Sequence, residues 1–349
     1  MKELDKIKAY IGQRGCCCAE GLVENFYLSL KTKPALFLLG HSNMDMTRLP
    51  RLFAGAVGAS AENGRYLQLT VKPDWMDSSD LFGWLNLEGK FVPGVMIDFM
   101  KAAREDPSHP YFLCMDQMIL SRAEYYLRDM LNAIDSRETE TKLPYVPTVY
   151  YGGDQTAWDT YGEIPLLQNL YIIATVNLDE TSLPLNQKLL DRVNTLSVLP
   201  SDLRGAQTES LPGEELHNDF LLTRYCRLDQ YEGSLDSDME SFEQINKILL
   251  EAKSYLGFKI RNDAILYLLH NRQTGALPEA AAMDHLLCQK VLPRLQGAAG
   301  LIRPALENLQ RYAGEHGYEK TVAGISRMLS QCDREGYASC WNIPHNLER

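Results

Sequence analysis

The chain has 349 residues, a formal net charge of −11 at pH 7 and a charged fraction of 23%. This length suits two domains, or one large α/β domain with an appended part. The acidic balance contains no run of Lys or Arg, which argues against a broad DNA-binding surface, because such a surface needs clustered positive charge. No apolar run approaches the roughly 18–20 residues that span a bilayer. We therefore expect a cytoplasmic protein without a membrane span, which meets DNA only indirectly.

Strand and helix patterns alternate along the first part of the chain. Residues 1–33 read as helices, and a hairpin is expected over 83–94, with its turn at Glu88-Gly89. Residues 146–151 have β-like content. The apolar spacing predicts strands at 35–39, 66–71, 111–115, 170–176 and near 195–199, with helices between them. Alternating strands and helices predict a mostly parallel sheet with helices on both faces.

After Pro200 the pattern changes to helices alone. Every segment from about residue 240 to 335 has apolar residues at helical spacing. Ten acidic residues between 205 and 245 precede these helices. The organisation that we expect is N-terminal helices (1–33), an α/β core (34–200), an acidic connection (201–240) and an all-helical lid domain (241–349).

Cysteines and histidines give no metal-binding pattern. Three of the eight cysteines form the run Cys16-Cys17-Cys18, and the chain has no C-x-x-C pair. The seven histidines show no H-E-x-x-H or H-x₃₋₅-H spacing. Since free cysteine is most often a small core residue, we expect buried, reduced thiols and no metal cluster.

The stretch FLLGHSNMDMT (37–47) begins like a phosphate-binding loop. An apolar strand leads to Gly40, and Thr47 opens a helix. Such a loop binds phosphate through backbone N–H groups and the helix dipole, while a lysine before the hydroxyl residue adds positive charge. Here Asp45 and Met46 stand where the pattern has Gly and Lys. Asp45 adds a carboxylate where phosphates would lie, so the sequence alone favours a degraded site or a chance match.

Three further motifs follow in order along the chain. Strand 111–115 runs into Asp116 and Gln117, where a Walker B strand has two acids, the first for Mg²⁺ and the second to polarise water. A Gln can orient water but cannot take its proton. Strand 170–176 ends at Asn177, a residue type that can hold the attacking water. Arg192 in LLDRVN could reach a neighbouring subunit's site or be an ordinary surface arginine.

The order of these motifs resembles the AAA+ ATPases of the McrB type and their MoxR-like relatives. The resemblance covers about residues 20–335. It rests on FLLGHSNMDMTRLPRLFAGAVG, DSSDLFGW…GKFVPG, YFLCMDQMILSRAEYYL, NLYIIATVNLDETSLPLNQKLLDRVN, GFKIRNDAILYLLHN and LLCQKVLPRLQG. It implies an AAA+ P-loop core with a parallel sheet flanked by helices, plus a C-terminal all-helical lid domain.

The resemblance also implies which residues would contact ATP or GTP with Mg. The loop positions are Gly40, His41, Ser42, Asn43, Asp45, Met46, Thr47 and Arg48. Thr47 and Asp116 would hold Mg, and Gln117, Asn177 and Arg192 would complete the catalytic set. Arg261 would be the lid's sensor arginine, against the alternative of a helix-start salt bridge. The family's GKT falls on residues 45–47, its Walker B Glu on Gln117 and its next Asn on Ile119, so three nucleotide-facing positions differ together.

Two functional interpretations follow from these differences. The first is a hydrolysis-deficient assembly or regulatory subunit of a restriction- or defence-like motor, in a homo- or hetero-oligomeric ring, with a McrC-like partner. The alternative is an active divergent ATPase or GTPase of a McrBC-like system, with Arg48 in place of the missing lysine. The 83–94 hairpin would line a central pore in such a ring, or simply cover the sheet edge.

Overall fold

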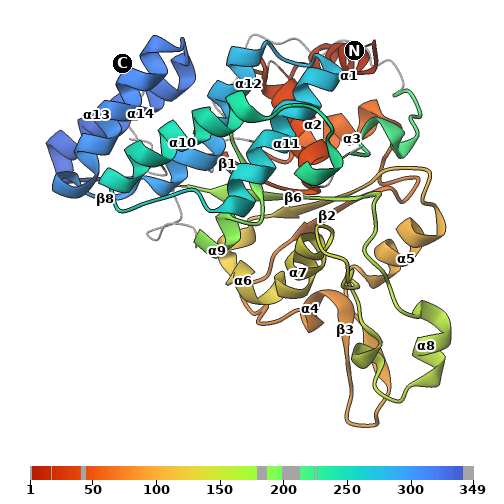
Figure 1. Ribbon diagram of the computed structural model, residues 1–349. Coiled ribbons are helices and arrows are strands. Elements are labelled where there is room, and N and C mark those ends of the chain that lie inside the picture. Colours follow the sequence, from red (N-terminus) through yellow and green to blue (C-terminus); the bar gives the residue numbers. More distant parts are fainter. Residues whose placement is uncertain are drawn as a thin grey trace.

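A computed structural model describes residues 2–16, 18–40, 45–178, 187–198, 213–223, 225 and 227–340 of the chain (Figure 1). These residues form a five-stranded sheet in the order β2-β5-β6-β1-β7. All neighbouring strands in it are parallel. The strands are β1 (Ala35–Gly40), β2 (Tyr66–Thr70), β5 (Tyr111–Asp116), β6 (Leu170–Asn177) and β7 (Asn194–Ser197). The predicted parallel sheet is confirmed, with strand ends within a few residues of those expected.

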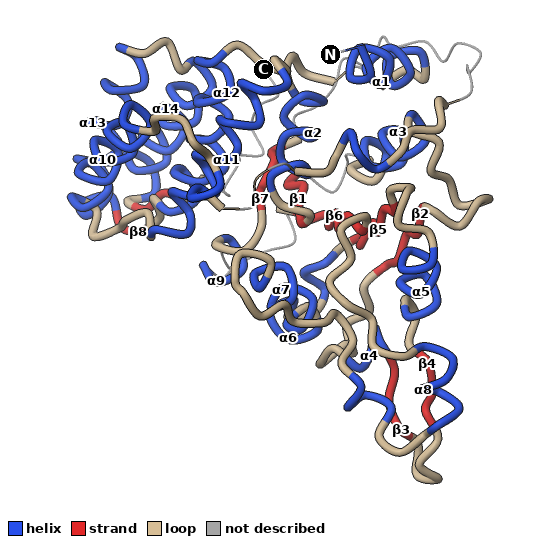
Figure 2. The backbone as a smooth tube through the Cα atoms, turned by 45° about the vertical axis from the view of Figure 1, so that its right-hand side comes forward, coloured by secondary structure: helices blue, strands red, loops and turns tan. Residues whose placement is uncertain are grey.

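Helices cover both faces of this sheet (Figure 2). Those up to the end of β7 are α1 (Lys2–Gln13), α2 (Leu22–Thr32), α3 (Arg48–Ala56), α4 (Ser79–Phe82), α5 (Ile97–Glu105), α6 (Ala123–Tyr126), α7 (Arg128–Ser136), α8 (Gln155–Tyr161) and α9 (Gln187–Leu190). Helices α1, α2 and α3 lie on one face, while α4 to α7 lie on the other (Figure 1). The single helix expected over 122–134 is therefore two, because a turn at Leu127 separates α6 from α7.

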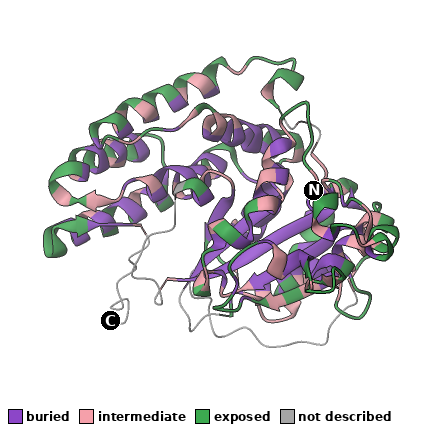
Figure 3. Ribbon diagram, turned by 90° about the horizontal axis from the view of Figure 1, so that it is seen from below, coloured by how far each residue is buried: buried purple, intermediate pink, exposed green. Residues whose placement is uncertain are grey.

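The central strands read as apolar runs because both of their faces are buried. In β1, Leu36 and Leu38 pack with α1 to α3, while Phe37 and Leu39 pack with the helices on the opposite face. Strand β6 is buried along its whole length. In the view from below, the strands have the colour of buried residues, while the helices beside them carry exposed residues on their outer surfaces (Figure 3). The side-chain period of two thus assigns alternate residues to two separate cores.

The C-terminal part is helical, as expected. Its helices are α10 (Asp236–Glu251), α11 (Phe258–Thr274), α12 (Glu279–Leu286), α13 (Ala299–Glu315) and α14 (Glu319–Glu335), with a π-helical turn at Leu287–Val291 and a short β8–β9 pair at Gly297–Ala298 and Tyr337–Ala338. Buried residues of these helices form one continuous core with α1 to α3 and the adjoining sheet face. Helix α11 packs directly against α2. The boundaries expected between connection and lid domain remain predictions.

An arm projects from the sheet at the end far from the C-terminal helices (Figures 1 and 2). It contains the predicted hairpin, whose strands are β3 (Gly83–Leu85) and β4 (Phe91–Pro93), with the turn at Glu88-Gly89. Asp154 fastens α8 to it by accepting a hydrogen bond from the backbone N–H of Phe91 at 2.8 Å. The β-like structure expected over 146–151 is wrong. Residues 148–151 form a 3₁₀ turn, and only Val146 makes an isolated bridge, to Ile164.

Among the described helices, none is both long and apolar enough to cross a membrane.

Candidate functional site

The carboxyl edge of the sheet brings the predicted motif residues together. Gly40 and Asn177 are direct partners in the β1–β6 ladder, at the last position of each strand. Asp116 ends β5, on the other side of β6. Two strand spacings separate β1 from β5, which is about 10 Å. In open parallel sheets this edge is where ligands bind.

Asp116 is held in place by Thr175 of β6. The Thr175 hydroxyl donates to Asp116 Oδ1 at 2.6 Å and accepts from the Gln117 backbone N–H at 2.9 Å. Gln117 has the left-handed backbone conformation, with φ 57° and ψ 47°. A non-glycine residue in that region carries strain of the order of 1 kcal/mol, which concentrates at functional sites. Gln117, which was predicted to occupy the second Walker B position, therefore has a constrained backbone.

The start of α3 shows what replaces the phosphate-binding residues. The Thr47 hydroxyl donates to Asp45 Oδ1 at 2.9 Å. The Met46 side chain is buried and brings no charge. Asp45 itself is exposed. His41, Ser42 and Asn43, which were also expected to contact a nucleotide, lie outside the described residues.

Arg48 points to the N-terminal segment. Its guanidinium donates to the backbone carbonyl of Arg14 at 2.6 Å, in the loop between α1 and α2. This contact engages one arm of the only cation within residues 45–48. The geometry therefore gives no support to Arg48 as a substitute for the missing lysine.

A magnesium–triphosphate group does not fit the described residues of this edge. Thr47 already bonds to the Asp45 carboxylate, and that carboxylate places a negative charge beside the position that phosphates would take. Two unit charges about 4 Å apart repel by ~4 kcal/mol at an effective dielectric of 20. Within the described residues, no group of three or more His, Cys, Asp and Glu side chains could hold a metal ion. We therefore derive no catalytic step through a bound nucleotide.

The two predicted arginines both have partners within the chain. Arg192 Nε lies 3.1 Å from Asp135 Oδ2, and the Arg192 side chain is about one-third exposed (33%). Asp135 also accepts Lys259 Nζ at 2.5 Å. Arg261 donates to Asn262 Oδ1 at 3.0 Å and lies over the Phe258 ring, 5.1 Å from its centroid. Arg261 thus bonds to a neutral amide and not to the carboxylate of the helix-start salt bridge considered above, and the roles of both arginines in catalysis stay predictions.

A cavity that the sequence reasoning missed lies beside the same edge. It has a volume of about 220 Å³, and its lining includes Leu39 of β1, Ser197 of β7 and residues of α12, the π-helical turn and α14. Gln289, 4% exposed, lines it with a side-chain oxygen that has no hydrogen-bond partner among the described atoms. Asn25 Nδ2 donates to His285 Nδ1 at 2.9 Å across the cavity wall. The partners are 260 residues apart, so no local pattern could have revealed them.

A buried ion pair fastens the C-terminal helices to the sheet near this cavity. Lys33 Nζ lies 2.5 Å from Asp263 Oδ2, and both side chains are almost completely buried. Burial alone would raise the pKa of Asp263, but the charges of Lys33, Lys290 and Arg137 outweigh it and lower that pKa. Lys290 donates to the Val193 carbonyl at 2.6 Å, and burial lowers its pKa to about 7.

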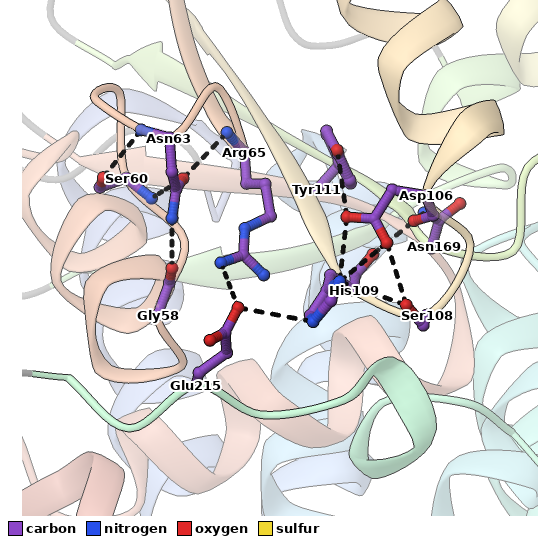
Figure 4. A network of polar contacts seen from close by, with 10 residues as sticks. All are labelled: Gly58, Ser60, Asn63, Arg65, Asp106, Ser108, His109, Tyr111, Asn169 and Glu215. Carbon is purple, nitrogen blue, oxygen red and sulfur yellow. Dashed lines mark hydrogen bonds and ion pairs between the residues drawn. The ribbon is translucent and has the colours of Figure 1, made fainter.

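A second polar network lies at the opposite, amino edge of the sheet (Figure 4). Arg65 donates to Glu215 Oε1 at 2.7 Å, and His109 Nε2 lies 3.5 Å from the same oxygen. Asn169 donates to the backbone carbonyls of Asp106 and His109, at 2.9 and 3.0 Å. Most of these contacts fix turns before β2, β5 and β6. The network therefore stabilises the fold and ties Glu215 to the sheet.

Comparison with known proteins gives three findings. Residues 213–337 match the model of a domain of unknown function (DUF8727). The structure is similar to that of a predicted ATPase from Cytophaga hutchinsonii, with 14% sequence identity, coverage of 82% of this chain and 81% of the other, and a TM-score of 0.47. It is also similar to NtrX from Brucella abortus, with 13% identity, coverage of 74% and 47%, and a TM-score of 0.31. Among curated proteins no match is found.

Proposed function

We propose that this chain is a McrB-type AAA+ protein that retains the P-loop NTPase fold but does not hydrolyse nucleotide. It acts as an assembly or regulatory subunit of a restriction- or defence-like motor complex. One observation carries the proposal. At the start of α3, Thr47 bonds to Asp45 and Met46 is buried, so the residues expected to bind phosphates contact each other or the core instead.

The arrangement of the strands supports the family assignment. The resemblance implies that the polar strand tip lies next to the Walker B strand, and β6 with Asn177 does lie between β1 and β5. Gly40, Asn177 and Asp116 meet at one edge although they are far apart in sequence. Since every strand of a parallel sheet ends at this edge, the support comes from the strand order β5-β6-β1, which places Asn177 between Asp116 and Gly40.

The magnitude of the missing chemistry supports loss of hydrolysis. Cationic groups at phosphoryl-transfer sites are worth factors of about 10³–10⁵ in rate. A general base contributes a further ~10²–10⁴. The two effects overlap, because residues that act as a unit are not additive. Even the smaller factor leaves turnover far below that of an intact motor.

A ring partner would supply what this subunit lacks. In such a ring Arg192 could stabilise transition-state charge in a neighbour's site, provided that it leaves Asp135. Lys259 would still neutralise Asp135 after that departure, so the carboxylate would not be left unpaired. The ion pair with Asp135 nevertheless opposes a role of Arg192 in a neighbouring subunit's site. We therefore propose assembly as the function and assign no part in it to Arg192.

Calorimetry with ATP and GTP, with and without Mg²⁺, tests the proposal together with phosphate release. We expect no measurable hydrolysis and weak or absent binding by the purified chain. The triple variant Asp45→Gly, Met46→Lys and Gln117→Glu should recover nucleotide binding, because Thr47 and the backbone around it are retained. Steady hydrolysis by the unmodified chain, abolished by Asp116→Ala, would overturn the proposal and support the divergent ATPase or GTPase.

A further inference from the structure

Two cysteines meet in the loop between α1 and α2. The Cys18 N–H donates to the Cys16 carbonyl at 3.0 Å. The two sulfur atoms lie 3.6 Å from each other. Sulfurs at this distance need to approach by only about 1.5 Å to reach the length of a disulfide bond. We expected buried, reduced thiols; Cys16 and Cys18 are free, but they are partly exposed instead of buried.

The pair is accessible from outside. Both cysteines are partly exposed and line an open cavity of about 820 Å³. The charged groups acting on Cys16 are the Arg48 guanidinium and the more distant carboxylate of Asp45. The hydrogen bond from Cys18 lowers the pKa of Cys16 to about 7, burial opposes this, and Arg48 assists it. At neutral pH a large fraction of Cys16 is therefore thiolate, the form that reacts with oxidants.

The other cysteines of the described chain differ from Cys16 in pKa, and two of them, Cys114 and Cys332, are also buried. Burial raises the pKa of Cys114 and of Cys288 to about 12. Burial also raises the pKa of Cys332 and of Cys340. Redox-sensing cysteines combine a low pKa, access to solvent and a second thiol in reach. Among the cysteines that the structure describes, Cys16 with Cys18 meets all three conditions.

We propose that Cys16 and Cys18 form a reversible redox pair, which closes to a disulfide with a peroxide and thereby changes the start of α3. Cys16 thiolate attacks one oxygen of hydrogen peroxide, the O–O bond breaks, and hydroxide leaves, so that Cys16 becomes a sulfenic acid. The Cys18 sulfur then attacks the Cys16 sulfur, and hydroxide leaves with the Cys18 proton as water. The peroxide gains two electrons, and the two thiols lose two hydrogen atoms.

The link from this pair to α3 is the Arg48 contact. Arg48 donates to the carbonyl of Arg14, two residues before Cys16. Forming the disulfide must move the loop between α1 and α2, because the Cys16 and Cys18 sulfurs have to approach each other. On the other side of the cysteine pair, Lys320 Nζ donates to the Glu20 carbonyl at 2.9 Å and ties the same segment to α14. Oxidation therefore acts on the first turn of α3, where the phosphate-binding segment would be.

The test uses the full chain treated with hydrogen peroxide, followed by thiol alkylation and intact mass spectrometry. Cys17 lies outside the described residues, so the variant Cys17→Ser is the matched control. We expect loss of two alkylatable thiols in the unmodified chain and in Cys17→Ser, reversed by a dithiol reductant. Cys16→Ser and Cys18→Ser should each form no internal bridge. A bridge that persists in Cys16→Ser, or that disappears in Cys17→Ser, overturns the assignment.

Two further measurements on Cys17→Ser test the mechanism. The rate of bridge formation should reach half its maximum near pH 7, and Arg48→Gln should move that midpoint to higher pH while Arg48→Lys moves it less. Hydrogen exchange in residues 48–52 should change on oxidation and return on reduction. A midpoint at the ordinary thiol pKa of about 8.5 contradicts activation of Cys16, and unchanged exchange contradicts the link to α3.

Discussion

The carboxyl edge of the sheet and the junction between α2 and α11 use polar residues in opposite ways. At the edge, the partners are close in sequence or on adjacent strands, as in Thr47 with Asp45 and Thr175 with Asp116. At the junction they come from distant helices and are fully buried, as in Lys33 with Asp263. A substitution at the edge therefore affects few other contacts, whereas a substitution at the junction affects a contact between segments that are far apart in sequence.

This difference shows where substitutions are tolerated. Asp45 is exposed, so placing a carboxylate there costs the fold little. Asp263 shares a buried site with several cations, and removing one partner leaves charge without compensation. Substitutions at exposed positions of the edge should therefore cost the fold less than substitutions at the buried junction.

Breaking the buried ion pair is the strongest test of the comparison. Lys33→Met should lower the free energy of unfolding by about 3–5 kcal/mol, because Asp263 stays buried without its main partner. Chemical denaturation measures this change. As a control, Lys6→Met removes the exposed pair with Glu214, whose side chains are 60% and 50% exposed, and should cost less than about 1 kcal/mol.

The double variant Lys33→Met with Asp263→Leu separates an unpaired charge from lost packing. It should regain part of the stability, because replacing both members of a buried pair by apolar residues is often close to neutral, while Lys290 loses the favourable charge of Asp263. Equal losses in the single and double variants would show that the junction depends on packing alone. Equal losses for Lys33→Met and Lys6→Met would remove the contrast between the two regions.

Acid should weaken the contact between α2 and α12, where Asn25 donates to the His285 ring. Burial, assisted by the nearby Lys320 ammonium, lowers the pKa of His285 to about 4, while Asp284 acts in the opposite direction. The unfolded ring, with a pKa near 6.5, binds a proton that the folded ring excludes, so stability falls as the pH drops from about 6.5 to 4. We expect this ring to contribute about 2–3 kcal/mol of that fall.

Denaturation of the variant His285→Gln at pH 7 and pH 4.5 measures this contribution. The variant should lose less stability on acidification than the unmodified chain. His316→Gln, at an exposed position, is the matched control for the substitution itself. If His285→Gln and the unmodified chain lose equal stability between pH 7 and pH 4.5, the His285 ring is already protonated in the folded chain at the lower pH.

The sequence predicted the edge far better than the junction. The strands 111–116 and 170–177 follow from apolar runs that end in polar residues, and parallel strands necessarily bring those ends to one edge. That Asp45 and Met46 stand where a nucleotide-binding loop has Gly and Lys came from the resemblance and stays a prediction. The roles of these residues in binding and catalysis are not established by their placement.

Other features depend on contacts that no local pattern contains. Lys33 and Asp263 are 230 residues apart, and each reads as an ordinary charged residue near a helix end. The error over residues 146–151 has a related cause. Val, Tyr and Thr favour strands on average, but Tyr151 packs against Phe91 of the arm, with ring centroids at 5.0 Å, and tertiary contacts decided the local structure.

The smallest effect is expected at the strained residue of the edge. Gln117 and Lys253 are the two non-glycine residues with positive φ in the described chain, at 57° and 54°. Gln117→Gly relieves the steric cost of that conformation but adds freedom to the unfolded chain, so the net gain should be at most about 1 kcal/mol. Lys253→Gly, outside the candidate site, should give a similar gain, and Gln117→Ala should give none. Thermal unfolding compares the three variants. If Gln117→Gly instead destabilises the chain while Lys253→Gly stabilises it, the Gln117 side chain itself stabilises the edge. The edge would then tolerate substitution less well than the comparison with the junction predicts.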